Sequence, residues 1–206
     1  DASEASVRAA LEAAHAAGLG LAEDFRTISE LEVRHKQDLS DPFSAADLRA
    51  EATVRTILAG GYPDYGFLGE EGGLIEGADR SHTWIVDPLD GTANFLIGLP
   101  LFAVNIALAR DGEVIAGVTH VPMLGETFWA ERGMGAFLNG QPIKVSNRTQ
   151  LIESILGVGI PFACKPRHEQ FAAEMQRLTP IVSGLRRLGA AAIDMAYVAC
   201  GRFDAY

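Results

Sequence analysis

Five short segments in the middle of the chain restrict its fold more than any other feature. They cover residues 102–110, 113–121, 126–131, 135–138 and 142–145. Asp111-Gly112 and Asn139-Gly140 each separate two of these segments, and both dipeptides favour the tight turn of a β-hairpin. We therefore expect this part of the chain to form one antiparallel sheet.

Two segments near the amino terminus have the apolar spacing of helices. Residues 3–25 place Leu11 and other apolar side chains at helical intervals. A second helix is expected over residues 44–61, because Ser44 followed by Asp47 resembles a capping box. Helices that cover a separate antiparallel sheet predict an α+β fold.

The chain changes character after residue 150. A strand, a helix, a strand, a helix and the start of another strand are expected at 154–160, 167–178, 181–188, 190–200 and 202–206. We interpret residues 1–150 as amino-terminal helices plus an antiparallel sheet that carries the functional site. Residues 151–206 are interpreted as an incomplete second α/β layer, so the sequence is expected to be part of a longer protein.

Composition excludes several classes of function. The chain has 206 residues, of which 48% are hydrophobic, as in a soluble globular protein. A formal net charge of −10 argues against a nucleic-acid backbone or an anionic membrane as the main partner. Cys164 and Cys200 are far apart in the sequence, so neither a disulfide framework nor a structural zinc site is expected. No apolar run is long enough to span a bilayer, and we expect a cytoplasmic protein.

The stretch 83–95 carries the clearest chemical signal. An apolar segment at 84–86 is typical of a buried strand and ends at Asp87, and a second carboxylate follows at Asp90. Gly91 and Thr92 come next, where a sharp turn into a short helix can offer unpaired N–H groups to an anion. Carboxylates beside an anion site are compatible when a divalent metal lies between them.

A further carboxylate follows another short strand. Residues 66–69 are expected to form this strand, which ends at Glu70-Glu71, and 74–82 is expected to be a flexible loop. Mg²⁺ prefers oxygen ligands, usually one or two carboxylates with water and substrate phosphate, so Glu70, Asp87 and Asp90 are candidate ligands. A Glu-Glu pair alone is more often a solvated surface pair, and no Ser-His or Cys-His pairing stands out as a source of a protein nucleophile.

One alternative is a phosphatase of the haloacid dehalogenase type, which uses an aspartate as nucleophile. Its signature resembles Asp-x-Asp-Gly-Thr after the first strand of the domain. Here two residues separate Asp87 from Asp90, and the motif follows two helices. The spacing therefore argues against this class.

The chain resembles the inositol monophosphatase family of Mg²⁺-dependent, lithium-sensitive phosphatases. The resemblance covers nearly the whole chain and is carried by residues 41–47, Gly69-Glu70-Glu71, residues 84–95 and residues 189–194. It implies a layered α-β-α-β-α sandwich of the inositol monophosphatase and fructose-1,6-bisphosphatase type, commonly as a homodimer. It also implies that the pattern continues past residue 206, with a glutamate that contacts substrate and an aspartate that completes the second metal site.

The resemblance also implies roles for individual residues. One metal would be bound by Glu70, Asp87 and the carbonyl of Leu89, a second by Asp87 and Asp90, and a third, weaker ion would lie near Glu70. Thr92 would hold the attacking water and be oriented by Asp47, which has an alternative role as a helix cap. The phosphate would be held by the N–H groups of Gly91 and Thr92. The substrate's hydroxyl groups would meet the backbone of Gly189, Ala190 and Ala191, although small residues there also suit close helix packing.

These roles predict Mg²⁺-dependent hydrolysis of a small phosphorylated polyol, with inositol 1-phosphate as the first candidate. Histidinol phosphate, fructose 1,6-bisphosphate and a nucleotide 3′-phosphate remain alternative substrates within the same superfamily. A catalytically inactive metal- or phosphate-binding regulator is the alternative from another class.

Overall fold

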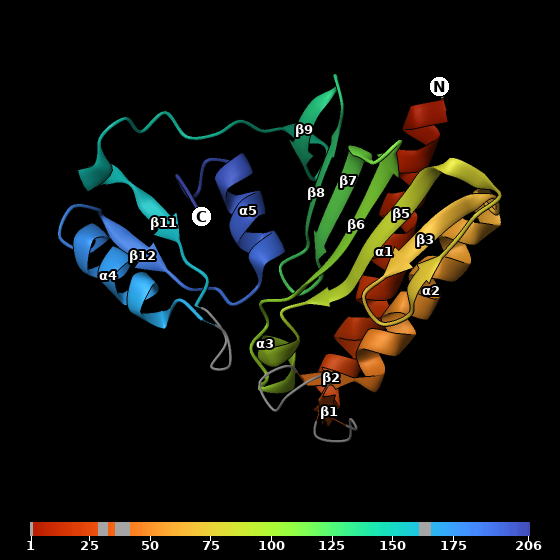
Figure 1. Cartoon of the computed structure of the whole chain (residues 1–206), viewed down its shortest axis with the longest axis horizontal. Helices are drawn as coiled ribbons and strands as arrows, with labels where there is room; N and C mark the ends of the chain where they lie inside the picture. Colours follow the sequence, from red (N-terminus) through yellow and green to blue (C-terminus); the bar gives the residue numbers. More distant parts are fainter. Residues whose placement is uncertain (1, 29–32, 36–41, 161–165) are drawn as a thin grey trace.

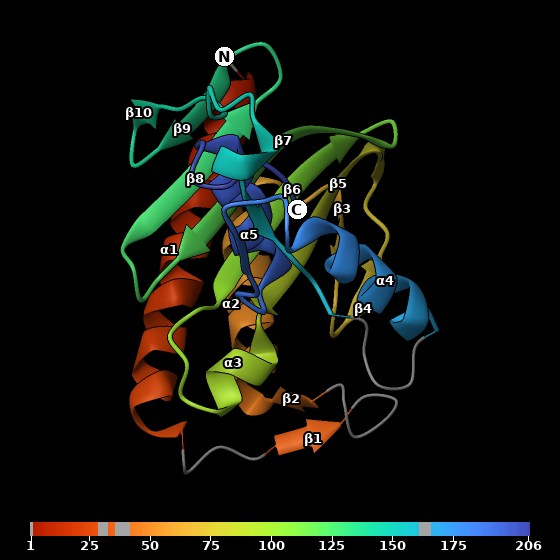
Figure 2. The ribbon, with the colours of Figure 1, turned by 90° about the vertical axis from the view of Figure 1, so that its left-hand side faces the viewer.

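The computed structural model describes residues 2–28, 33–35, 42–160 and 166–206, and it arranges them in five layers (Figure 1). Two long helices cover one face of an eight-stranded sheet, and a shorter helix lies on the other face. A two-stranded sheet and an outer helix complete the stack, and Figure 2 views the same layers from the side of that outer helix. The expected α-β-α-β-α arrangement is confirmed.

Small side chains allow the two long helices to pack closely. The first, α1 (Ala2–Arg26), is continuous, and the second is α2 (Ala45–Gly61). Ala14 and Ala17 of α1 and Ala50 of α2 are all buried, and they belong to one core cluster with apolar residues of the large sheet. Helices with alanine at their contact can approach closely because no long side chain separates them.

The large sheet is mixed, with strand order β10-β9-β8-β7-β6-β5-β3-β4. Its strands in chain order are β3 (Tyr65–Gly69), β4 (Gly73–Ile75), β5 (Asp79–Asp90), β6 (Ala103–Arg110), β7 (Glu113–Val121), β8 (Glu126–Glu131), β9 (Gly135–Leu138) and β10 (Gln141–Pro142). All neighbours are antiparallel except β3 and β5, which run parallel. The antiparallel sheet expected over residues 102–145 is confirmed, because every pairing from β6 to β10 is antiparallel. The parallel pair lies before it: β4 reverses the chain beside β3, and the next reversal returns β5 along the other edge of β3.

The two predicted hairpin turns are confirmed. Asp111 and Gly112 between β6 and β7 have φ angles of 51° and 81°, and Asn139 and Gly140 between β9 and β10 have 48° and 78°. Positive φ at both central residues is the requirement of a type I′ turn, which the Asp-Gly and Asn-Gly dipeptides meet at low cost.

Strand β5 is longer than the sequence suggested. The loop expected over 74–82 is wrong, because β4 occupies part of it and β5 already begins at Asp79. The apolar run at its centre also alternates rather than being buried throughout: Trp84 and Val86 are buried, whereas Ile85 is 38% exposed. Polar side chains at the start of β5 masked its strand character, because they lie on the half-exposed end of the sheet.

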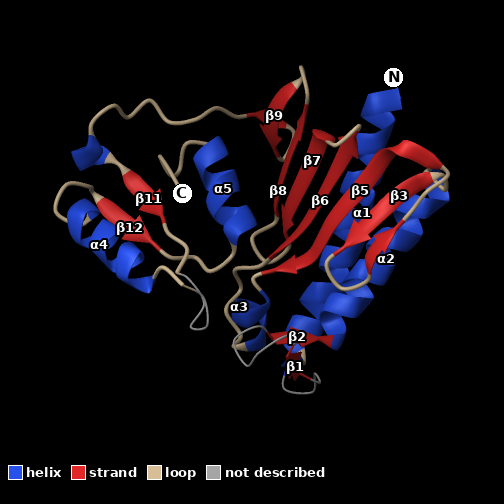
Figure 3. Cartoon of the chain, in the orientation of Figure 1, coloured by secondary structure: helices blue, strands red, loops and turns tan. Residues whose placement is uncertain are grey.

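The carboxyl-terminal part forms a small parallel unit, shown by element type in Figure 3. β11 (Ile155–Gly157) and β12 (Gly184–Arg186) pair in parallel, and α4 (His168–Leu178) connects them on the outside. Both strands are shorter than expected. α5 (Ala191–Ala199) follows, and Ala205 forms a single parallel bridge with Leu156. The division into domains at residue 150 stays a prediction. Across that boundary, α5 shares a core cluster with the large sheet.

Smaller elements complete the description. They are β1 (Val33–His35) paired with β2 (Pro42–Ser44), α3 (Thr92–Leu96) and the 3₁₀ turn η2 (Leu151–Glu153). Asp41, Cys164 and the side chain of Ser44, which entered the sequence interpretation, lie outside the described residues. In the described ranges, no helix is both long and apolar enough to cross a bilayer.

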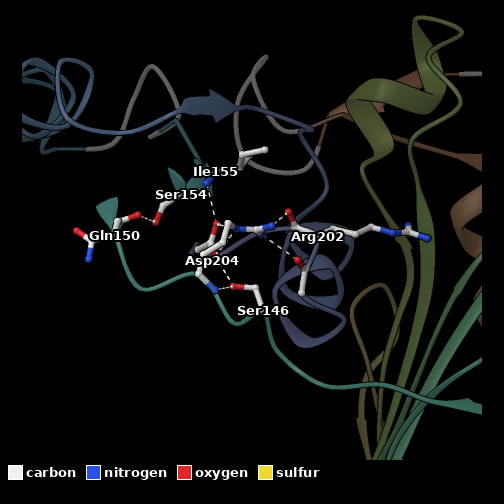
Figure 4. Close-up of polar contacts among 8 residues, drawn as sticks. Ser146, Gln150, Ser154, Ile155, Arg202 and Asp204 are labelled. Carbon is white, nitrogen blue, oxygen red and sulfur yellow. Dashed lines mark hydrogen bonds and ion pairs between the residues drawn. The ribbon is translucent and has the colours of Figure 1, made fainter. Parts of the chain in front are cut away.

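A polar cluster around Asp204 fixes the link between the two sheets to the end of the chain (Figure 4). Arg148 Nε donates to both carboxylate oxygens of Asp204, at 2.8 and 2.9 Å, and the Ile155 N–H donates to Oδ2 at 2.7 Å. The Ser146 hydroxyl donates to Oδ1. Burial opposes ionisation of Asp204, but these hydrogen bonds outweigh it and hold its pKa below the usual value.

Candidate functional site

The candidate site is a pocket of about 340 Å³ between the large sheet and the carboxyl-terminal unit. The end of β5 and the start of α3 form one wall, and residues 158–160 and 187–191 contribute to the opposite side. Every predicted site residue except Asp47 lines the pocket: Glu70, Asp87, Leu89, Asp90, Gly91, Thr92, Gly189, Ala190 and Ala191.

A β-bulge brings the two aspartates of β5 onto the same wall. Asp87 lies opposite Asn105 of β6, and Asp90 lies opposite Ala103. Three steps along β5 therefore match two along β6, so β5 contains one extra residue. In a regular strand, residues three apart face opposite sides of the sheet. With the bulge, both carboxylates line the pocket.

The carboxylates of this wall repel one another. Burial and the charge of Glu70 raise the pKa of Asp87 to about 8, with smaller contributions from a hydrogen bond with Glu70 and from Asp90. The Leu89 N–H, 3.1 Å from Asp87 Oδ1, offsets part of this effect. Burial also raises the pKa of Asp90, although the N–H groups of Ala192 and Ala191 oppose it. A cation between neighbouring carboxylates lowers their pKa values and so favours their ionised forms.

The donor set fits a hard divalent cation such as Mg²⁺. Glu70, Asp87 and Asp90 supply only oxygen atoms, and Leu89 also lines the pocket. Within the described ranges, no three His, Cys, Asp or Glu side chains enclose an ion by themselves. Mg²⁺ does not need such a cage, because it usually keeps several waters and takes one or two carboxylates.

Thr92 connects the pocket to α2. Its Oγ1 lies 3.1 Å from Asp47 Oδ1 and 2.9 Å from the Leu89 carbonyl oxygen. Asp47 is only 1% exposed and lies in the first turn of α2. The predicted proximity of Asp47 and Thr92 is present, whereas their catalytic roles stay predictions.

Gly91 is required by the backbone at the start of α3. Its φ angle is 93°, in the left-handed region that other residues adopt with strain. A Cβ atom here would lie 2.9 Å from the Leu101 carbonyl oxygen and 3.1 Å from the Ala190 side chain. The glycine thus allows the segment before α5 to approach the aspartates closely.

Two further contacts hold that segment in place. Asn94 is 3% exposed, and its Nδ2 donates to the carbonyls of Leu101 and Leu188, at 2.8 and 2.7 Å. The Ala192 N–H donates to Asp90 Oδ2 at 2.7 Å. Because the Ala191 N–H also acts on Asp90, these two groups stabilise a carboxylate of the wall.

Among the pocket residues that sequence reasoning missed, three have polar side chains: Asp194, Tyr206 and Arg187. Burial raises the pKa of Asp194 to about 6, and the charge of Asp90 adds to this while Arg187 opposes it. Arg187 is the one basic residue among the described residues that line the pocket. An acid in a helix that has no other charged residue was the available signal for Asp194.

A Ser-His-Asp group occurs elsewhere on β5 but lacks the geometry of a catalytic triad. Ser81 Oγ and Asp79 Oδ2 both lie 2.8 Å from the same ring nitrogen of His82, Nδ1. A triad needs the serine and the aspartate on opposite nitrogens of the imidazole. Ser81 and His82 are therefore in contact, but the arrangement is not one that activates a serine as nucleophile.

Known proteins with similar sequences agree with the interpretation of the pocket as a phosphatase site. The family model described as "Inositol monophosphatase family" matches residues 3–206. An inositol-1-monophosphatase of Caulobacter vibrioides is 51% identical over 95% of this chain and 77% of its own length. A protein named Nus factor SuhB, from Pseudomonas aeruginosa, is 40% identical over 96% of this chain and 74% of its own.

Solved structures give the same result. The extragenic suppressor protein suhB from Bartonella henselae superposes with a TM-score of 0.93 at 43% identity, covering 97% of this chain and 76% of that chain. An inositol monophosphatase from Anabaena has a TM-score of 0.81 at 35% identity, covering 97% of this chain and 73% of that one. With its fold, its acidic pocket and these relatives, the chain belongs to the inositol monophosphatase family of Mg²⁺-dependent phosphatases.

Proposed function

We propose that this protein hydrolyses a small phosphomonoester with a metal-activated water, and that inositol 1-phosphate is its substrate. The observation that carries this proposal is the acidic wall of Glu70, Asp87 and Asp90 directly before the glycine turn at Gly91. Because these carboxylates repel one another, bound cations would stabilise them. The N–H groups at the adjacent helix start favour the binding of an anion such as phosphate.

Glu70, Asp87 and the Leu89 carbonyl would hold one Mg²⁺, and Asp87 with Asp90 a second; a third, weaker ion would lie near Glu70. Bound Mg²⁺ would lower the pKa of a water and neutralise charge on the phosphate oxygens. The Leu89 carbonyl also lies 2.9 Å from the Thr92 hydroxyl oxygen, and a carbonyl oxygen has two lone pairs for two partners.

The chain's own groups would orient the reactants. The Thr92 hydroxyl, which is held by Asp47, would bind the attacking water. The N–H groups of Gly91 and Thr92 would bind the phosphate, because the first N–H groups of a helix lack partners within it.

The substrate's hydroxyl groups would meet the opposite wall. Gly189 and Ala190 line the pocket there and would offer backbone groups. Ala191 would have two roles. Its N–H group stabilises the ionised form of Asp90, and its backbone would also contact the substrate.

Asp87→Asn tests the proposal. We expect the variant to fold but to lose turnover by about 10²- to 10³-fold, the scale seen when a group that stabilises transition-state charge is removed. The measurement is phosphate release from inositol 1-phosphate with Mg²⁺ and with EDTA. Retained Mg²⁺-dependent activity in the variant would overturn the assignment.

A panel of phosphate esters distinguishes the substrates. Inositol 1-phosphate, histidinol phosphate, fructose 1,6-bisphosphate and a nucleotide 3′-phosphate are compared at equal concentration. The highest kcat/KM is expected for inositol 1-phosphate. A preference of tenfold or more for another ester would replace inositol 1-phosphate while leaving the phosphatase assignment intact.

A second candidate is a regulatory role without turnover. Relatives named Nus factor SuhB, 36 to 42% identical, favour it, because their name does not refer to an enzyme. An inactive protein that still binds Mg²⁺ would support this candidate.

We also propose that the protein acts in the cytoplasm as a homodimer. Light scattering of the purified protein tests the oligomeric state.

A further inference from the structure

Glu51 is a buried carboxylate of α2 that the proposed mechanism does not use. Its residue is only 6% exposed, and it lies one helical turn after Asp47, which is also buried. Residues four positions apart lie on the same face of a helix, so α2 carries two buried acids one above the other. Two ionised carboxylates at this spacing destabilise a helix, so the stability of α2 does not by itself favour the pair.

The Glu51 carboxylate contacts the turn that follows β3. Its Oε2 accepts a hydrogen bond from the Glu71 N–H at 2.8 Å. Glycines on either side of this turn leave room for the carboxylate. A Cβ atom at Gly69 would overlap Oε2, and one at Gly72 would lie 2.6 Å from Oε1. The carboxylate therefore lies directly against the backbone of residues 69–72.

Glu70 lies within this turn, and β5 holds it from the other side. The Glu70 N–H donates to the Val86 carbonyl at 3.1 Å, and Val86 directly precedes Asp87. The backbone around Glu70 is thus bound to β5 through its own N–H and to α2 through the N–H of the next residue. Because Glu70 and Asp87 line the same pocket, these two hydrogen bonds restrict the position of one carboxylate relative to the other.

Asp47, the other buried acid of α2, contacts a second segment of the pocket. Its Oδ1 lies 3.1 Å from the hydroxyl oxygen of Thr92, at the start of α3. One face of α2 therefore contacts both the turn that carries Glu70 and the start of α3. Because α2 packs into the core of the large sheet, it can hold both segments in fixed positions.

We propose that Glu51 is a positioning residue for the metal site: by accepting the Glu71 N–H, it holds the turn so that the Glu70 carboxylate stays beside Asp87. This inference rests on the proposed function, because it concerns a residue that the proposed function assigns to Mg²⁺. The described residues that line the pocket do not include Glu51, so it acts through the turn and not on the cation itself. Without Glu51, the Glu71 N–H loses this acceptor and the turn is free to shift.

Glu51→Ala tests the inference by cation binding alone. Isothermal titration calorimetry with Mn²⁺, without substrate, is performed on the wild-type protein, on this variant and on Glu70→Gln, which identifies the binding event that depends on Glu70. We expect Glu51→Ala to weaken that event by about 10- to 100-fold, the scale seen when an outer partner of a metal ligand is removed. Unchanged Mn²⁺ affinity would overturn the inference.

Glu51→Gln separates the hydrogen bond from the charge. The amide oxygen of glutamine can accept the same Glu71 N–H, so the Mn²⁺ affinity of this variant is expected to remain close to that of the wild type. A loss as large as that of Glu51→Ala would show that the charge of Glu51 matters and not its hydrogen bond. That result would contradict a positioning role.

Val54→Ala is the matched control for lost stability. Val54 is buried in the same helix and belongs to the core cluster, so its truncation removes packing without removing the acceptor of the Glu71 N–H. Thermal unfolding is expected to show a lower Tm for both Val54→Ala and Glu51→Ala. Only Glu51→Ala is expected to bind Mn²⁺ more weakly. Equal losses of affinity would assign Glu51 a purely structural role and overturn the inference.

Gly72→Ala perturbs the same contact from the side of the turn. Gly72 is exposed, so the variant is expected to fold, but its new Cβ would lie 2.6 Å from Glu51 Oε1 and displace the carboxylate. The Mn²⁺ binding event that depends on Glu70 is expected to weaken. This variant decides the question if Glu51→Ala does not fold, and unchanged Mn²⁺ affinity would then overturn the inference.

Glu70→Gln separates this inference from the proposed function. If Glu70→Gln weakens Mn²⁺ binding while Glu51→Ala does not, only the inference fails. If the wild-type protein neither binds Mn²⁺ nor releases phosphate with Mg²⁺, the proposed function fails and the inference fails with it.

Discussion

Two half-buried carboxylates, Asp204 and Asp87, have pKa values shifted in opposite directions, and their neighbours explain the difference. Asp204 receives hydrogen bonds from Arg148, Ser146 and the Ile155 N–H, and its pKa is lowered. Asp87 faces Glu70, and its pKa is raised to about 8 by burial and then by that neighbour's charge. The partners of Asp204 come from the chain, whereas burial and the charge of Glu70 favour the neutral form of Asp87, and a bound cation would favour its ionised form.

The pocket depends on the backbone conformation of Gly91, which a residue with a side chain would adopt only with strain. Gly91→Ala is expected to destabilise the protein by about 1–3 kcal/mol, the cost of a strained backbone conformation. Activity is expected to fall further, because the new Cβ would lie 2.9 Å from the Leu101 carbonyl oxygen and displace the phosphate-binding turn. Urea unfolding and phosphate release measure the two effects.

Gly112→Ala is its control. Gly112 also has a positive φ angle, 81°, but a Cβ atom there would meet nothing within 4 Å. Gly112→Ala is expected to lower the stability of the protein without lowering its activity. Equal activity losses in the two variants would contradict a specific role for the turn at Gly91.

At the scale of elements, α5 joins the two sheets. Ile193 and Ala196 pack in one cluster with Val121 and Phe128 of the large sheet, while the Ala192 N–H binds Asp90. The carboxyl-terminal unit is additionally fixed by Asp204, which binds the linker at Arg148. The pocket thus lies where the large sheet meets the carboxyl-terminal unit, so its shape depends on how α5 is held.

Asp204→Asn is expected to loosen this attachment. Loss of hydrogen bonds from charged Arg148 costs about 1.5–3 kcal/mol of stability. Limited proteolysis within residues 143–150 is expected to become faster, and urea unfolding gives the change in free energy. Glu113→Gln, which breaks an exposed ion pair with Arg132, is the control and is expected to have a smaller effect, because water screens an exposed pair. A cost for Asp204→Asn no larger than that of the control would contradict the attachment.

At the scale of the whole molecule, the acidic pocket makes metal-free stability depend on pH. The folded-state pKa of Asp87, about 8, lies above its ordinary value of 3.8. A carboxyl group whose pKa is raised by folding stabilises the folded state fully below its unfolded pKa, and this contribution is lost as pH rises through the folded pKa. Stability in EDTA is therefore expected to fall between about pH 4 and pH 8.

Thermal unfolding at several pH values, with EDTA and with Mg²⁺, measures this dependence. Asp87→Asn is the reference, because it lacks the group and is expected to show a weaker fall. His120 acts in the opposite direction: burial, and then the charge of His15, lower its pKa to about 4, so its contribution is lost as pH falls from 6.5 towards 4. A wild-type curve parallel to that of Asp87→Asn across pH 6.5–8 would contradict the prediction.

Local sequence patterns determined much of this molecule. The Asp111-Gly112 and Asn139-Gly140 turns, the helix over α1 and the carboxylates at Asp87 and Asp90 were all predictable. Each depends on the conformational preference of a few neighbouring residues, or on the contrast between an apolar strand and the acid that follows it. Such signals are complete within a short segment and need no knowledge of distant contacts.

Only the tertiary structure decided the rest. The parallel pairing of β3 with β5, the bulge that turns Asp87 and Asp90 to one wall, and the approach of Asp194 to that wall join segments far apart in sequence or depend on strand register. The strand that ends in two acids was recognisable from its own residues. Which other carboxylate shares its pocket was set by how α5 packs on the large sheet, and no pattern within either segment records that contact.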